Sequence, residues 1–148
     1  MEDLCKIRDL QRAIARFEAA FIQRFGLTLN EGMLLCTLLE QPCLSASELA
    51  EALGLTPSNT SKVIRPVEDK QLIARLIGKE DKRHMLFTLT PEGRRLIQEI
   101  KESTHEVPED LLKALSSFPD HDKQRPKPPT QPDAERSAHP CLEPKPGG

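Results

Sequence analysis

The sequence predicts a mostly helical α+β domain in which helices flank one short β-hairpin. Three observations indicate this fold class. Apolar residues recur at spacings of three and four over most of the first 118 residues. Thr-Pro pairs at 56–57 and 90–91 mark two helix starts. Between them, a stretch from 72 to 89 changes to an alternating pattern that a polar turn interrupts.

The first forty residues predict two helices. One apolar stripe runs through residues 3–25 and consists of Leu4, Ile7, Leu10, Ile14, Phe17, Phe21 and Phe25. Gly26 follows in the position where a left-handed residue commonly ends a helix. Thr28 and Glu31 then form a T-x-x-E capping box that starts the second helix, which Gln41-Pro42 ends.

The next segment predicts two helices joined by a tight turn. Ser45 and Glu48 form another capping box, so a third helix covers 45–53 and Gly54-Leu55 makes the turn. Thr56 as the N-cap and Pro57 at the first helical position start a fourth helix over 57–70.

A hairpin and closing helices follow. Residues 72–77 and 83–89 predict two strands about a polar turn at 78–82. Helical segments are expected over 91–118, with an interruption at Pro108. The whole order predicts a winged helix-turn-helix from Ser45 to Leu89, with a two-stranded wing and flanking N- and C-terminal helices.

The chain divides into two regions by composition. Residues 1–118 are expected to form the winged-helix domain, whose helices 3–25 and 91–118 are candidates for dimerisation because one small domain cannot easily cover the whole apolar stripe of 3–25. That stripe could instead belong to an intramolecular core. Residues 119–148 hold eight of the thirteen prolines and only one large aliphatic residue, Leu142, so a disordered Pro-rich tail is expected.

Composition and charge exclude several classes of protein. The net charge is −2, but residues 56–95 carry nine basic against five acidic side chains, a local excess of +4. Such an island favours a polyanionic partner at one surface, although a solvated charged face would give the same count. The apolar runs are too short for a membrane span and the N-terminus lacks a signal-peptide pattern, so no membrane association and a cytoplasmic location are expected.

Nothing in the sequence indicates catalysis or a bound cofactor. The four cysteines form no CxxC pair and the four histidines show no ligand spacing, so no metal site is expected. No GxSxG, P-loop or GxGxxG motif is present, which argues against an enzyme.

Helix 57–70 has the chemistry of a major-groove reading helix. Small hydroxyls near its start allow close approach to DNA, Asn59 can pair with an adenine edge, and Lys62 or Arg65 can reach guanine or phosphate. Backbone N–H groups at the helix start would add a phosphate site. The candidate DNA-binding residues are Ser58, Asn59, Thr60, Ser61, Lys62, Arg65, Arg75, Lys79, Asp81, Lys82 and Arg83.

Five segments together resemble the MarR family of bacterial winged-helix regulators. They are Leu-Thr-Leu-Asn-Glu at 27–31, Ser-Glu-Leu-Ala-Glu-Ala-Leu-Gly-Leu-Thr-Pro-Ser at 47–58, Leu-Ile-Ala-Arg at 72–75, Asp-Lys-Arg at 81–83 and Leu-Thr-Pro-Glu-Gly at 89–93. The resemblance implies that helix 57–70 reads the major groove and that Arg83, oriented by Asp81, enters the minor groove from a wing at 78–83. Asp81 and Arg83 could also form only a turn salt bridge.

The resemblance further implies a homodimer and an unidentified small-molecule effector that binds between the dimerising and DNA-binding parts. The sequence departs from the family at Pro66, which is expected to kink the reading helix, and at Gln71, where glycine is common. The family's long closing helix is also not visible after Phe118.

These observations predict a sequence-specific double-stranded DNA-binding transcriptional regulator. The alternative is a winged-helix module that binds protein and not DNA. A steep salt dependence of binding to duplex DNA distinguishes the two.

Overall fold

The computed structural model describes residues 2–77, 85–103 and 107–119, and its elements follow the predicted order. The helices and strands are α1 (Glu2–Phe25), α2 (Leu29–Glu40), β1 (Leu44–Ser45), α3 (Ala46–Leu53), α4 (Pro57–Asp69), β2 (Ile73–Ile77), β3 (Met85–Leu89), α5 (Pro91–Lys101) and α6 (Glu109–Leu115). The predicted mostly helical winged-helix fold is therefore confirmed. The predicted tail, except Pro119, lies outside the described residues.

The sheet has one strand more than the sequence predicted. Its order among the described residues is β1-β3-β2, with both pairs antiparallel. β2 and β3 form the expected hairpin, in which Ile73 pairs with Leu89 and Ile77 with Met85. β1 adds Leu44 opposite Phe87. A two-residue strand is too short to show alternation, so only packing against β3 reveals it.

The core lies between α2, α3, α4, α5 and the sheet. α2 supplies its centre because Leu34, Leu35 and Leu38 are fully buried, as its nearly continuous apolar run predicted. The other elements each add one or more side chains to the same cluster, among them Leu49, Val63, Ile64, Val67, Ile73, Phe87 and Ile97. The aliphatic content of the chain thus builds a single core.

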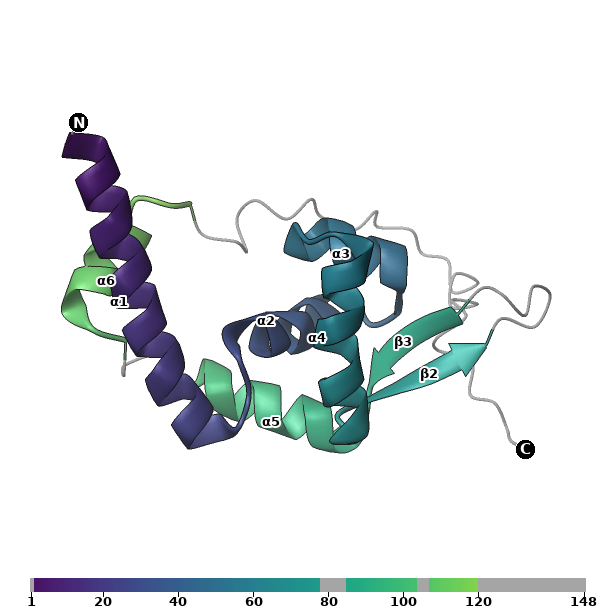
Figure 1. Cartoon of the computed structure of the whole chain (residues 1–148). Helices are drawn as coiled ribbons and strands as arrows, with labels where there is room; N and C mark the ends of the chain where they lie inside the picture. The colour runs from purple at the N-terminus through teal and green to yellow at the C-terminus, as the bar shows by residue number, and fades with distance from the viewer. Residues whose placement is uncertain (1, 78–84, 104–106, 120–148) are drawn as a thin grey trace, which may run out of the picture.

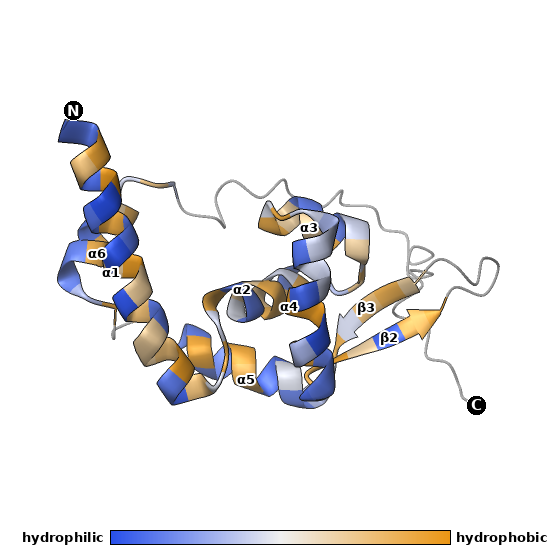
Figure 2. Cartoon of the chain, in the orientation of Figure 1, coloured by the Kyte–Doolittle hydropathy of each residue, from blue (hydrophilic) through white to orange (hydrophobic). Residues whose placement is uncertain are grey.

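α1 stands apart from this body with α6 at its side (Figure 1). Only Ala13 and Phe21 of α1 are buried, and Leu111 of α6 is buried as well. Figure 2 shows apolar stretches along both helices. The large apolar side chains that stay exposed on these helices are Leu4, Ile7, Leu10, Ile14, Ile22, Leu112 and Leu115, and Phe118 just after α6 is exposed as well.

The sequence predicted a kink of the fourth helix at Pro66, and the helix continues through that residue. α4 is one helix from Pro57 to Asp69, with Pro66 inside it. A proline there removes the hydrogen bond to the Lys62 carbonyl, and its ring also crowds that carbonyl. The N–H of Lys70 bonds the Pro66 carbonyl at 3.0 Å, which completes the last turn.

Candidate DNA interface

The helix-turn-helix is held by side-chain caps at both helix starts. Ser45 Oγ accepts from the Glu48 N–H at 3.2 Å, and Thr56 Oγ1 accepts from the Asn59 N–H at 3.1 Å. Between the helices, Gly54 has a φ of 70°, a left-handed conformation that glycine adopts without steric cost. The two caps and the Gly54 turn together fix the angle between α3 and α4.

α4 has two distinct faces. Its core face carries Thr60, Val63, Ile64 and Val67. After Pro57, the exposed side chains of its first two and a half turns are Ser58, Asn59, Ser61, Lys62 and Arg65, all of which the sequence proposed as DNA contacts. Their spacing of three and four places them along one outward strip that is polar at the start of the helix and basic further along.

Thr60 is a correction to the predicted set. Its exposed fraction is 1%, and its hydroxyl donates to the Thr56 carbonyl at 2.7 Å. The residue sits three and four positions before Val63 and Ile64, so it shares their buried face. Its side chain therefore belongs to the packing of α4 and does not reach the outward strip.

Backbone donors at the start of α4 are largely used within the helix. Pro57 has no N–H, and the N–H groups of Asn59 and Thr60 both bond to Thr56. The predicted phosphate site at this helix start therefore has few backbone N–H groups to offer, and phosphate binding would depend on side chains such as Lys62 and Arg65.

The turn after α4 is fixed by backbone contacts. Gln71 has a φ of 62°, where the family commonly has glycine, and its N–H bonds the Glu68 carbonyl at 2.9 Å. The Thr90 hydroxyl donates to the Gln71 carbonyl at 2.8 Å, so α5 starts against this turn. A Cβ on Gly93 would lie 2.0 Å from the Leu72 carbonyl oxygen, which explains glycine at that position.

Arg75 lies on β2 but binds the last turn of α4. Its Nε and Nη2 donate to the two carboxylate oxygens of Glu68, the second at 2.9 Å. That hydrogen-bonded carboxylate raises the pKa of the Arg75 guanidinium above its ordinary value, although burial acts in the opposite direction. Sequence reasoning proposed Arg75 as a DNA contact and did not find Glu68, because nothing local links two residues on different elements.

The remaining predicted wing contacts are Lys79, Asp81, Lys82 and Arg83, and they fall outside the described residues. The structure describes the base of the wing, where Ile77 pairs with Met85.

A second ionic contact joins α4 to the α1–α2 junction. Lys70 Nζ donates to the Gly26 carbonyl at 2.9 Å and lies 3.5 Å from a Glu31 carboxylate oxygen. The same oxygen accepts from the Thr28 N–H at 3.1 Å, which completes the predicted capping box. Sequence analysis identified Glu31 as a cap but did not find its contact with Lys70.

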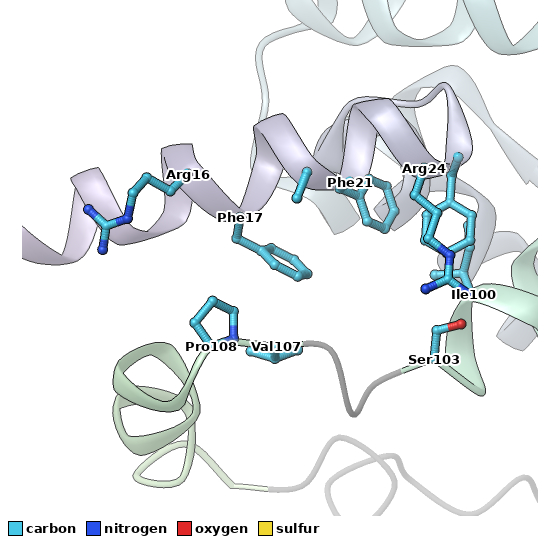
Figure 3. Close-up of a pocket in the computed structure, with 10 residues that line it drawn as sticks. Arg16, Phe17, Phe21, Arg24, Ile100, Ser103, Val107 and Pro108 are labelled. Atoms are coloured by element: carbon cyan, nitrogen blue, oxygen red, sulfur yellow. The ribbon is translucent and has the colours of Figure 1, made fainter.

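A pocket of about 210 Å³ lies where α1 faces α5 and the segment leading into α6 (Figure 3). Its walls are mainly apolar and include Phe17, Phe21, Ile100 and Val107. Two arginines of α1 also line it: Arg16 lies 3.4 Å from Asp110, and the Arg24 guanidinium lies 5.1 Å from the centre of the Phe25 ring. The pocket therefore has aromatic walls and two arginines in its lining, of which Arg16 is paired with Asp110.

The family model for the MarR family matches residues 27–85, from the turn after α1 to the first residue of β3. Over this segment the chain is similar to MarR-family proteins. The HTH-type transcriptional repressor Rv2887 of Mycobacterium tuberculosis is 37% identical over 78 residues, which are 53% of this chain and 56% of that protein. The HTH-type transcriptional regulator PrsX of Escherichia coli is 29% identical over 106 residues, 70% of this chain and 61% of that protein. The matches thus span less than two thirds of these relatives.

Solved MarR-type structures have the same fold. BpsR of Bordetella bronchiseptica superposes with a TM-score of 0.65 at 22% identity, covering 83% of this chain and 91% of that chain. MarR of Escherichia coli gives 0.60 at 20% identity, covering 79% and 84%. A MepR mutant of Staphylococcus aureus, solved with an oligodeoxyribonucleotide, gives 0.57 at 21% identity, covering 79% and 83%. These superpositions show that this chain has the winged helix-turn-helix fold.

Two further features bear on function. No helix within the described ranges is long and apolar enough to span a membrane. In the same part of the chain, no three His, Cys, Asp or Glu side chains gather in a way that could hold a metal ion.

Proposed function

We propose that this chain is a sequence-specific double-stranded DNA-binding transcriptional regulator. The observation that carries the proposal is the division of α4 into a buried face and an exposed polar and basic strip, within a helix-turn-helix. A helix of this kind fits the major groove and can present side chains to base edges. A relative named as a transcriptional repressor and a MepR solved with an oligodeoxyribonucleotide support the same function.

Within this proposal the exposed residues of α4 and the wing contact different parts of the DNA. Asn59 and Ser58 lie near the start of α4 and are placed to read bases, while Lys62 and Arg65 reach guanine or phosphate. The wing would add Arg83 in the minor groove, oriented by Asp81, with Lys79 and Lys82 on phosphates. The regulator would act by binding DNA and not by catalysis, as MarR-family proteins generally do. Its proposed location is the cytoplasm.

The exposed apolar stripe of α1 supports a homodimer. Leu4 and Ile7 are 58% and 51% exposed, and no element of the described chain covers them. A second copy that packs the same stripes of α1 and α6 would remove this surface from water. Two reading helices on one symmetric dimer would then contact two half-sites.

The pocket between α1 and α5 is the proposed site for an effector. The aromatic walls suit a small aromatic molecule, and a carboxylate on that molecule would bind Arg16 in exchange for Asp110. In the structural relative BpsR, 6-hydroxynicotinic acid regulates DNA binding, and that compound belongs to this class.

The test of DNA binding is a salt-titrated series on duplex DNA from upstream of the chain's own gene and on a random duplex. Lys62→Ala is expected to reduce the salt slope by about one, as loss of a phosphate contact does. Asn59→Ala should reduce the preference for the specific duplex, and Arg83→Ala should weaken specific binding by roughly 1–3 kcal/mol.

The matched control is Lys101→Ala, which removes an exposed lysine from the end of α5 and should leave both duplexes unaffected. Equal losses from all variants on both duplexes would contradict the assigned roles. No binding to any duplex at low salt would reject the regulator in favour of a winged-helix module that binds protein.

A further inference from the structure

The Arg75 guanidinium joins three elements at the base of the wing. Its Nε and Nη2 bind both carboxylate oxygens of Glu68 in α4. Its Nη1 lies 3.2 Å from the Met85 sulfur, and its central carbon lies 5.5 Å from the centre of the Phe87 ring, both on β3. Arg75 itself belongs to β2. One planar cation therefore ties the last turn of α4 to both strands of the hairpin.

These contacts use the groups that a DNA contact would need. A guanidinium recognises a base edge or a phosphate through its paired N–H donors. Here two of those donors already bind the Glu68 carboxylate. The partner also cancels the charge, so the Arg75–Glu68 pair exerts little net attraction on a phosphate. Glu68 lies three positions after Arg65 on α4 and is therefore its neighbour on the helix surface.

We propose that Arg75 is a positioning residue for DNA binding, which acts through Glu68 and does not contact DNA itself. The inference rests on the proposed function. A winged helix must place α4 and the wing on the duplex at the same time, so the angle between them has to be held before binding. The backbone between α4 and β2 is only a short turn (Figure 1). The Arg75–Glu68 pair spans that turn with two hydrogen bonds.

The same pair keeps Glu68 from acting on its neighbour. Without Arg75, the carboxylate would be free to pair with Arg65 and draw it from the outward strip, or to repel DNA directly. The proposal therefore predicts a change in DNA affinity opposite to the one expected from charge alone. Removing the acid Glu68 should weaken DNA binding, whereas electrostatics alone would have that removal strengthen it.

The experiment measures duplex affinity against salt for the full chain and for Arg75→Ala, Glu68→Ala, the double alanine variant and the exchanged pair Glu68→Arg with Arg75→Glu. Each single alanine variant is expected to lose about tenfold in affinity, and the double variant no more than either single one. The salt slope should stay that of the unchanged chain, because no phosphate contact is lost. The exchanged pair should recover at least half of the loss on a logarithmic scale.

Arg8→Ala is the matched control, since Arg8 also forms an exposed ion pair, with Asp9 at 3.2 Å on α1, and its loss should leave affinity unchanged. Circular dichroism and melting of each variant separate lost positioning from lost folding, and the exchanged pair keeps the test decisive if an alanine variant unfolds.

A tighter-binding Glu68→Ala, a salt slope about one unit lower in Arg75→Ala, or no recovery in the exchanged pair would overturn the positioning role while leaving the regulator intact. If the unchanged chain binds no duplex at low salt, the proposed function fails and this inference with it.

Discussion

Among the described residues, Gln71 is the one non-glycine residue with a positive φ. Its φ of 62° places a non-glycine residue in the left-handed region, which costs roughly 1–2 kcal/mol. The conformation is held by its N–H bond to Glu68 and by the Thr90 hydroxyl on its carbonyl. Both are backbone contacts of Gln71, so they do not depend on its side chain.

Gln71→Gly is therefore expected to stabilise the chain. Glycine removes the strain but gives the unfolded chain more freedom, worth about 0.4–1 kcal/mol, so the net gain should be on the order of 0.5–1 kcal/mol. Thermal melting should show a rise of about 2–4 °C. Gln71→Ala is the matched control: it removes the same side chain, keeps the steric cost, and should show no such rise. A glycine variant that melts below the alanine variant would refute the strain argument.

At the scale of elements, Pro66 shows how position decides the effect of a helix breaker. Inside a helix a proline costs about 3 kcal/mol or more in the general case. Here α4 continues because Val63, Ile64 and Val67 anchor the helix in the core. The core contacts of α4 outweigh the local preference against a helix, and the outward strip is kept.

The pocket between α1 and α5 leads to a prediction at the same scale. Ala20 lines the pocket and the adjacent Ala19 does not, and both are exposed alanines of α1. Ala20→Phe should fill the pocket and abolish binding of 6-hydroxynicotinic acid and of benzoate, measured by calorimetry, while Ala19→Phe should bind as the unchanged chain does. Unaltered binding in Ala20→Phe would move the effector site elsewhere, and no binding of either acid to the unchanged chain would contradict the proposed ligand class.

For the whole molecule, the uncovered stripe of α1 predicts the assembly state. Ile7→Asp places a charge on a side chain that is 51% exposed, so it should hardly affect folding of one copy but should oppose association of two. Sedimentation equilibrium should show a dimer for the unchanged chain and a monomer for Ile7→Asp. DNA affinity should fall by about 10²-fold because the second half-site contact is lost.

Gln23→Asp is the control for that experiment, because it adds the same charge to an exposed polar residue on the side of α1 opposite Ile7 and should leave the dimer in place. A chain that is monomeric at high micromolar concentration before any substitution would reject the homodimer. The apolar face of α6, with Leu112 and Leu115 exposed, would then need another explanation.

The sequence by itself determined the elements and most of their limits. Capping boxes, Thr-Pro starts and glycine ends depend on residues within about four positions of one another, so they can be read without the fold. The predicted helix starts at Thr28, Ser45, Thr56 and Thr90 all have the expected N-cap hydrogen bonds. Thr60 was wrongly predicted to contact DNA, although its spacing from Val63 and Ile64 places it on their buried face.

Only the tertiary structure decided what joins these elements. The strand β1, the pairing of Arg75 with Glu68 and the contact of Lys70 with Glu31 each connect segments that no local pattern relates. Glu68 and Arg75 are seven residues apart but lie on a helix and a strand, and Glu31 and Lys70 are 39 apart. Such contacts depend on the packing angle of the helices, which the shared core sets through the side chains of every element at once.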